Sequence, residues 1–322
     1  MTARADVPVA GGTLATYSLG SDPPRVLAVH GVTATHRAWV AVARALGGDV
    51  TLVAPDIRGR GASNGLPEPY GIAAHARDML AVLDHFNLER TLLVGHSLGA
   101  YIAARVAAGH PERVSAVVLV DGGLTLPLPA DADPQEVQRA VLGPALTRLQ
   151  MTFASRQAYR AWWRGHPAFA DSDVDDEVLG AYADYDLIGV EPELRSGISQ
   201  EAVRGDGADL FVMGEPAHRL TVPATMLCAP RGLQDEPNPL QPLPLVEQWV
   251  AEAPAERRFQ QVPDVNHYTL VMGRRGAHAV AQAVREALNY GSSSYGKSVS
   301  SSAPSSVTYT RSSSRHPPKP MR

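Results

Sequence analysis

Cysteine is almost missing from the 322-residue sequence, and neither sign of charge is in large excess. The single Cys228 excludes a disulfide within the chain, and its apolar surroundings are typical of a buried strand. Lys and Arg together number 29 against 33 Asp and Glu, which gives a formal net charge of -4. A chain with such balanced charge has no long-range attraction for nucleic acid or anionic lipid, so we expect neither as a partner.

Long apolar runs and cofactor motifs are missing as well. No stretch approaches the roughly 20 apolar residues of a membrane span, and the first residues lack the apolar segment of a signal peptide. We therefore expect a soluble, cytoplasmic protein without membrane contact. The sequence contains no Cys/His cluster with metal-ligand spacing and no Gly-rich nucleotide fingerprint after the first strand, so we predict no metal and no cofactor.

The composition changes near residue 290. Residues 290–322 consist mostly of Ser, Pro, Gly and basic side chains with little to bury, and we expect them to form a disordered tail. The rest of the chain is rich enough in apolar residues for one large core, because 44% of the whole sequence is hydrophobic. The folded part is therefore expected to end at about residue 289.

Short Val/Leu-rich runs alternate with helical stretches over most of the chain. Examples are TLLVGH at 91–96 and AVVLVD at 116–121, each bounded by a helical pattern. Strands that are apolar along their whole length are typical of parallel sheets, in which crossover helices cover both faces. The pattern predicts an α/β fold with a mostly parallel, twisted sheet and helices on both faces, built from residues 1–123 and 221–289.

Residues 124–220 interrupt this alternation and are expected to form an inserted helical cap. The insertion carries several aromatic side chains, among them Tyr159, Trp162 and Trp163. Such side chains serve either to line an apolar substrate pocket or to pack helices against one another, and the sequence leaves both open. We name these three residues, together with His36 of the core, as candidates for contact with substrate.

A single serine lies between two glycines where a buried strand ends and a helix begins. Ser97 stands in the pentapeptide GHSLG, which matches the G-x-S-x-G pattern of a nucleophile placed on a sharp strand-to-helix turn. The flanking Gly95 and Gly99 have no Cβ to collide where strand and helix cross closely. At the start of the helix, the backbone N–H of Leu98 is expected to point toward an oxyanion formed on an attacked carbonyl.

Taken together, four stretches resemble the α/β-hydrolase superfamily, and the match covers roughly residues 10–289. LAVHGVTAT at 27–35 is similar to the His-Gly loop of that family, and PDIRGRGAS at 55–63 resembles its structural Asp-x-Arg-Gly turn. GHSLG at 95–99 is the third stretch. VPDVNHYTL at 262–270 resembles the loop that brings in the catalytic histidine.

This resemblance implies that Ser97 is a nucleophile, that His267 is its general base, and that Val32 supplies the second N–H for the oxyanion beside Leu98. The chain position of His267 supports its role independently. Of the eleven histidines, it is the one on a loop at the carboxyl end of a predicted strand, where ligands meet open α/β sheets.

The acid that orients the histidine should lie between the serine and the histidine in the chain order of this fold. Asp235 is the first choice, because the loop PRGLQDEP follows a strand and has the Gly-x-x-Asp spacing that similar hydrolases use. Asp121, at the end of AVVLVD, and Glu236 are the alternatives, and the sequence leaves all three open.

We therefore predict a serine hydrolase that cleaves a carboxylic ester, lactone or thioester of a small, partly apolar molecule through an acyl-enzyme intermediate. Hydrolysis of C–C bonds and cofactor-free perhydrolysis are alternative reactions of the same triad. A hydrolase-like receptor for a small ligand is an alternative from another class. The sequence leaves the identity of the substrate and the oligomeric state open.

Overall fold

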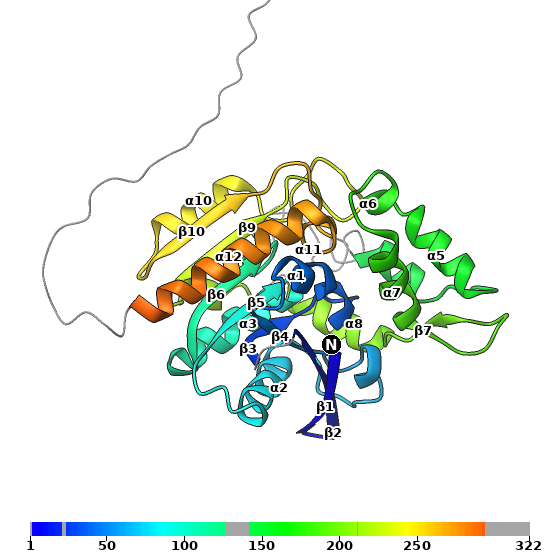
Figure 1. Cartoon of the computed structure of the whole chain (residues 1–322), viewed down its shortest axis with the longest axis horizontal. Helices are drawn as coiled ribbons and strands as arrows, with labels where there is room; N and C mark the ends of the chain where they lie inside the picture. Colours follow the sequence, from blue (N-terminus) through cyan, green and yellow to red (C-terminus); the bar gives the residue numbers. More distant parts are fainter. Residues whose placement is uncertain (1, 21–23, 126–141, 211, 294–322) are drawn as a thin grey trace, which may run out of the picture.

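The computed structural model describes residues 2–20, 24–125, 142–210 and 212–293. Within these ranges an 8-stranded sheet runs through the molecule in the order β1-β2-β4-β3-β5-β6-β9-β10 (Figure 1). β1 and β2 form an antiparallel hairpin, β2 is antiparallel to β4, and the other neighbours are parallel. The strands span Thr2–Val9 (β1), Gly12–Leu19 (β2), Pro24–Val29 (β3), Thr51–Pro55 (β4), Thr91–His96 (β5), Val114–Val120 (β6), Ala224–Cys228 (β9) and Arg257–Gln261 (β10).

The parallel strands are apolar on both faces because both faces are covered by helices. Successive residues of β3 show this, since Val26 and Ala28 belong to one apolar core while Leu27 and Val29 belong to the other. Helices α1 and α12 close the first core, and α2, α3 and α10 close the second. These elements and the short helices beside them span His36–Trp39 (η1), Val40–Ala45 (α1), Gly61–Ser63 (η2), Ile72–His85 (α2), Leu98–Gly109 (α3), Pro111–Arg113 (η3), Leu243–Ala251 (α10), Thr269–Met272 (α11) and Arg274–Ser293 (α12).

Residues 124–220, called the insertion below, separate β6 from β9. Helices α5, α6 and α7 of this insertion lie together at one end of the sheet (Figure 1). The insertion contacts the loops at the carboxyl ends of β3 and β4, because Tyr182 donates to the carbonyl of Thr33 and Ser199 N–H donates to the carbonyl of Gly59. Its elements span Arg156–Arg164 (α5), Pro167–Ala170 (α6), Asp176–Asp186 (α7), Leu187–Ile188 (β7), Arg195–Ser196 (β8), Gln200–Asp209 (α8) and Glu215–His218 (α9).

The predicted fold class, a mostly parallel sheet with helices on both faces, is confirmed. The β1–β2 hairpin was not predicted, because its strands mix polar and apolar residues and lack the Val/Leu runs that mark the central strands. The stretch after His267 is helical and is divided at Gly273 into α11 and α12. Helix α12 continues to Ser293, and the rest of the predicted tail, residues 294–322, lies outside the described residues.

Candidate active site

Ser97 lies on a sharp turn between β5 and α3. Its backbone angles are φ 54° and ψ -122°, a conformation that costs a residue with a side chain of order 1–3 kcal/mol. A Cβ at Gly95 would lie 2.1 Å from the carbonyl oxygen of Gly99, and one at Gly99 would lie 2.0 Å from that of Val29. Only glycine fits at these two positions, and the close crossing of strand and helix holds Ser97 in the strained turn.

A buried imidazole and a buried carboxylate are joined beside this serine. Nδ1 of His267 lies 2.7 Å from Oδ2 of Asp121, and the other carboxylate oxygen accepts from the N–H of Ala229 at 3.0 Å. Asp121 follows β6, which pairs with β5, and the N–H of Ser97 donates to the carbonyl of Val120. The bond to Asp121 leaves Nε2 as the free ring nitrogen of His267. No hydrogen bond joins Ser97 to His267 within the described ranges.

The prediction of Asp235 as the partner of His267 is wrong in the structure, which pairs the histidine with Asp121 instead. The Asp235 carboxylate forms an ion pair with Arg231 at 2.9 Å and accepts from the side chain of Asn266 at 2.8 Å. Asp235 therefore supports the loop that carries His267 and does not touch the imidazole ring.

Glu236 does not reach the histidine either, because its carboxylate accepts from the N–H of Gln234 at 2.6 Å within the same loop. The order of the strands explains both results. β6 lies directly beside β5, whereas β9, which precedes the loop of Asp235 and Glu236, is one strand farther from the turn of Ser97. An acid that ends β6 is therefore nearer to the serine than an acid in the loop after β9.

The loop after β3 passes close to Ser97, and two of its carbonyls accept hydrogen bonds from buried side chains. A Cβ at Gly31 would lie 3.1 Å from the Cβ of Ser97. The carbonyl of Val32 accepts from Nε and Nη2 of Arg60 at 2.9 and 2.8 Å, and the carbonyl of Thr33 accepts from Tyr182 at 3.3 Å. These contacts hold the peptides of the loop in one orientation.

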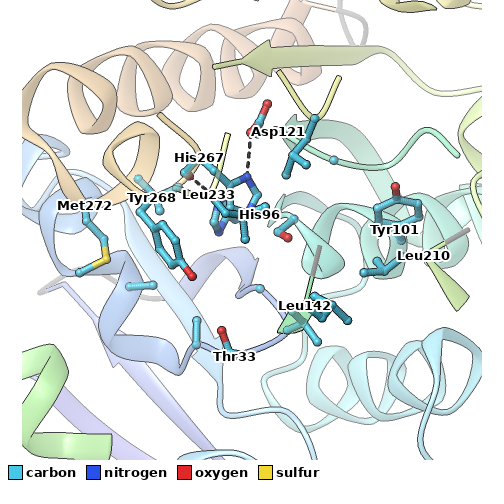
Figure 2. A pocket seen from close by; sticks show the side chains of 18 of the residues that line it. Thr33, His96, Tyr101, Asp121, Leu142, Leu210, Leu233, His267, Tyr268 and Met272 are labelled. Carbon is cyan, nitrogen blue, oxygen red and sulfur yellow. Dashed lines mark hydrogen bonds and ion pairs between the residues drawn. The ribbon is translucent and has the colours of Figure 1, made fainter. Parts of the chain in front are cut away.

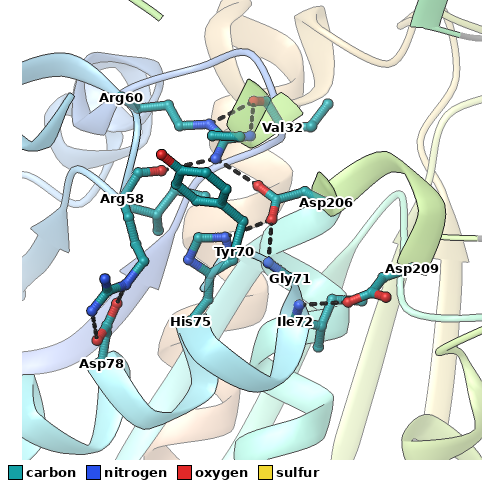
Figure 3. Close-up of polar contacts among 12 residues, drawn as sticks. Val32, Arg58, Arg60, Tyr70, Gly71, Ile72, His75, Asp78, Asp206 and Asp209 are labelled. Atoms are coloured by element: carbon teal, nitrogen blue, oxygen red, sulfur yellow. Dashed lines mark hydrogen bonds and ion pairs between the residues drawn. The ribbon is translucent and has the colours of Figure 1, made fainter. Parts of the chain in front are cut away.

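Arg60 belongs to a buried network that joins this loop to helix α8 of the insertion (Figure 3). Its Nη1 lies 2.5 Å from Oδ2 of Asp206, whose Oδ1 accepts from the N–H of Gly71 at 2.6 Å and lies 2.9 Å from Nε2 of His75. Burial alone would raise the pKa of Asp206, but the charges of Arg60 and His75 and the hydrogen bonds lower it to about 2. The aspartate is therefore ionised, and the position of the insertion is linked to the position of the loop.

A mostly apolar pocket opens at Ser97 and His267 (Figure 2). The core supplies most of its wall, and the insertion contributes Leu142, Tyr182 and Leu210. The pocket is lined by Gly31, Val32, Thr33, Ala34, Ala38, His96, Ser97, Tyr101, Asp121, Gly122, Leu142, Tyr182, Leu210, Leu233, Leu240, Gln241, His267, Tyr268, Val271 and Met272.

The three aromatic residues of α5 that we predicted as substrate contacts do not line this pocket. Tyr159 is fully buried, and its hydroxyl binds the carboxylate of Asp186. Trp163 is buried beneath the guanidinium of Arg148, 4.9 Å from its ring, and the Trp162 ring packs on it at 5.0 Å. The prediction is wrong because these side chains serve the packing of the insertion, the alternative that the sequence had left open.

His36 is also absent from the pocket wall. Its ring is fully buried, stacks on Tyr17 with a centroid distance of 3.6 Å, and places Nδ1 2.9 Å from Oδ1 of Asp56. His36 is therefore a buried residue that is bonded to the turn after β4, and it does not contact the pocket in this structure.

Several pocket residues were missed by the sequence prediction. Tyr101 follows Ser97 by four residues, so helical periodicity could have placed it on the same face of α3. Tyr268 follows His267 directly. Gln241 had no signal in the sequence, because it enters the pocket from a loop. Tyr182 is one of several aromatic residues of the insertion, and the sequence did not distinguish it from those that serve packing.

Two buried histidines near Ser97 are held neutral. Burial is the main cause that lowers the pKa of His30 to about 4, and it lowers the pKa of His96 well below its usual value. His30 donates from Nδ1 to the carbonyl of Gly31 at 2.8 Å and accepts from the N–H of Ile57 on Nε2 at 3.1 Å. This pairing requires the neutral ring, since a protonated ring has no acceptor.

Acid is expected to destabilise the fold through these histidines. His30 and His96 bind protons more readily in the unfolded chain, so the stability they contribute is present above pH ~6.5 and is lost as the pH falls below it, for His30 down to its folded-state pKa of about 4. His30 alone accounts for roughly 3 kcal/mol over that interval. Urea unfolding curves across the interval measure this loss. The variant His110→Gln, which changes an exposed histidine, should show the same dependence of the free energy of unfolding on pH as the wild type. A free energy of unfolding that does not change with pH in the wild type would contradict the expectation.

The described part of the chain holds no group of three or more His, Cys, Asp or Glu side chains placed to bind a metal ion. Within the same ranges, no helix is both long enough and apolar enough to cross a membrane.

The chain is similar to proteins of one large family. A family model described as the alpha/beta hydrolase fold matches residues 24–184, which are half of the chain. Lipase LipV of Mycobacterium tuberculosis (strain ATCC 25618 / H37Rv) is 32% identical over 168 residues, which cover 49% of this chain and 59% of the lipase. A putative carbamate hydrolase, RutD, of Klebsiella pneumoniae (strain 342) is 44% identical over 89 residues, which cover 27% of this chain and 34% of that protein. The chain thus covers less than two thirds of the length of these relatives.

Two solved structures share the architecture over most of the chain. E-2-(acetamidomethylene)succinate hydrolase has a TM-score of 0.74 and 21% identity, and the match covers 90% of this chain and 100% of that one. A thioesterase domain from the curacin biosynthetic pathway has a TM-score of 0.67 and 22% identity, covering 88% and 99%. Sheet order, strained serine turn and family model agree, and the chain belongs to the alpha/beta hydrolase fold family.

Proposed function

We propose that the protein is a serine hydrolase that cleaves a carboxylic ester, lactone or thioester with a triad of Ser97, His267 and Asp121. One observation carries the proposal. The pocket that contains the strained Ser97 also contains an imidazole whose Nδ1 is bonded at 2.7 Å to a buried carboxylate. A serine hydroxyl is a weak nucleophile near neutral pH and needs such an oriented base.

In the proposed reaction, Asp121 accepts the Nδ1–H bond and so keeps the lone pair of His267 on Nε2. Nε2 takes the proton of Ser97 while Oγ attacks the carbonyl carbon, a contact that commonly tightens only when substrate is bound. The protonated imidazole then gives this proton to the leaving alcohol or thiol. Water attacks the acyl-enzyme, gives a proton to Nε2, and the acid leaves as the serine hydroxyl is restored.

The backbone N–H groups of Val32 and Leu98 are the proposed donors to the oxyanion. Leu98 is the first residue of α3, and the N–H groups of a first helical turn have no partner within the helix. The carbonyls of Val32 and Thr33 are held by Arg60 and Tyr182, which favours a fixed orientation of the loop. A single preorganised donor of this kind lowers the barrier by about 3 kcal/mol.

The wall of the pocket supports a small and partly apolar substrate, because leucine, valine, methionine and alanine side chains make up much of it. Among the relatives, one is named a lipase and one solved neighbour is named a thioesterase, which favours a bond between an acyl carbon and oxygen or sulfur. The proposed reaction uses no cofactor.

A panel of chromogenic esters, thioesters and lactones of increasing acyl length tests the proposal. We expect sustained turnover of at least one ester or thioester, and we expect a fluorophosphonate to attach to Ser97, as located by mass analysis of peptides. Peroxide-dependent turnover alone would favour perhydrolysis, and turnover of a diketone but no ester would favour C–C cleavage. Binding without turnover would favour the receptor, and a label on another residue would contradict the assignment of the nucleophile.

A further inference from the structure

The pocket extends to two sides of the histidine pair. In Figure 2, Tyr101 and Leu210 lie on one side of His96 and His267, and Tyr268 and Met272 lie on the other. The first side is called the Tyr101 arm below and consists of Tyr101, Leu210, Leu240 and Gln241, all of which line the pocket. Tyr101 follows Ser97 by one turn of α3, about 6 Å along the helix axis. A substrate group in this arm is therefore several bonds from the carbonyl that Ser97 attacks.

Gln241 presents an unpaired acceptor in this arm. Its side chain is fully buried, and Nε2 donates to the carbonyls of Leu240 at 3.2 Å and Leu124 at 3.4 Å. Since only the NH₂ group of an amide can donate to a carbonyl, these two contacts determine which way the amide points. Oε1 is the other end of the amide, and it is buried without a hydrogen-bond partner among the residues that the structure describes.

The surroundings of Gln241 do not satisfy this oxygen. The hydroxyl of Tyr101 donates to the carbonyl of Leu124 and is thereby already used, and Leu210 and Leu240 have no polar side-chain atom. A buried acceptor without a partner is costly, and the cost is removed when a ligand supplies a donor. The donor should be neutral, because none of the four described side chains that define the arm is a carboxylate that could pair with a buried cation.

Resting on the proposed function, we infer that Gln241 is a specificity-determining residue whose Oε1 accepts a hydrogen bond from a neutral N–H or O–H group of the substrate. The substrates are then esters or thioesters with one largely apolar arm that carries an amide N–H or a hydroxyl several bonds from the reacting carbonyl. A purely hydrocarbon arm leaves the acceptor unpaired and is a poorer substrate.

Matched substrates test this inference on the wild-type protein. Each pair consists of a chromogenic ester whose arm contains a secondary amide and the ketone in which CH₂ replaces the N–H, so that shape is kept and the donor is lost. Both acyl-side and alcohol-side series are made with spacers of increasing length. We expect kcat/KM to favour the amide by about tenfold or more at the best spacer.

The variant Gln241→Met keeps the length of the side chain and removes the acceptor. We expect its ratio of kcat/KM between amide and ketone to fall to about one, within roughly twofold. The exposed Gln248, on the neighbouring α10, provides the matched control Gln248→Met, which should keep the wild-type ratio. Should Gln241→Met fail to fold, the wild-type ratio still decides.

Equal wild-type rates for amide and ketone at every spacer in both series would overturn the inference and leave the proposed hydrolase intact. A ratio that Gln241→Met retains would assign the recognition to another group and would also overturn it. If no ester is turned over and a fluorophosphonate leaves Ser97 unmodified, the proposed function itself is wrong.

Discussion

Replacement of Ser97 by alanine is expected to abolish ester turnover, by a factor of roughly 10³ or more, while the protein stays folded. The loss follows because the hydroxyl is the only group at the strained turn between β5 and α3 that could form the acyl-enzyme. Alanine is smaller than serine and adds no atom to the crowded crossing with Gly95 and Gly99, so the turn itself should persist. Steady-state rates on the best ester of the panel measure the effect.

The control for this experiment is Ser115→Ala on β6, because Ser115 does not line the pocket. It should hydrolyse the ester at nearly the wild-type rate and react with the fluorophosphonate at Ser97. Substantial turnover by Ser97→Ala, with circular dichroism showing a folded protein, would be incompatible with Ser97 as nucleophile.

The second large effect is expected for Asp121→Asn, which should lower kcat by roughly 10⁴. Oδ1 of Asp121 accepts from the N–H of Ala229, so the carbonyl of an asparagine would remain at that position. Its NH₂ group would then face Nδ1 of His267, where it can only donate. The imidazole would carry its proton on Nε2 and could not accept the proton of Ser97.

The matched variants are Asp235→Asn and Glu236→Gln, which make the same change in the two acids that the structure keeps away from the imidazole. Both should retain kcat within a few fold of the wild type. The value of kcat is measured for all three variants on the same ester at one pH near neutrality. If Asp235→Asn were the damaging change and Asp121→Asn were mild, the assignment of the acid from this structure would have to be reversed.

The fold could be predicted from the sequence to a large extent, because its signals are local. The Val/Leu runs at β5 and β6 have to be buried on both faces, and this requirement holds wherever the strands lie in the sheet. The hairpin of β1 and β2 was missed because this local signal is absent there: its strands are half polar, lie at one edge of the sheet and contain no Val/Leu run. Helical aromatic residues such as Trp163 were ambiguous, because the same side chain suits a pocket wall and a packed interior.

The local conformation of the chain around Ser97 could be predicted from the sequence alone. A serine between Gly95 and Gly99 at the end of a strand has one way to turn, since a Cβ at Gly95 would collide with the backbone of α3 and a Cβ at Gly99 with the backbone of Val29 in β3. The approximate place of His267, on a loop at the carboxyl end of a strand, could also be predicted, because the strand before that loop has a local pattern in the sequence.

Only the tertiary structure decided which acid meets His267 and which side chains enclose the pocket. Asp121 is 146 residues from His267 in the chain and reaches it because β6 is inserted between β5 and β9 in the sheet. The spacing in PRGLQDEP is compatible with an acid at Asp235, but the carboxylate is used by Arg231 and Asn266, contacts that no linear pattern contains. Likewise, Gln241 enters the pocket from a loop, and the direction of its amide depends on carbonyls from two separate segments. Contacts of this kind follow from the order of strands and the path of loops, and local propensity does not encode either.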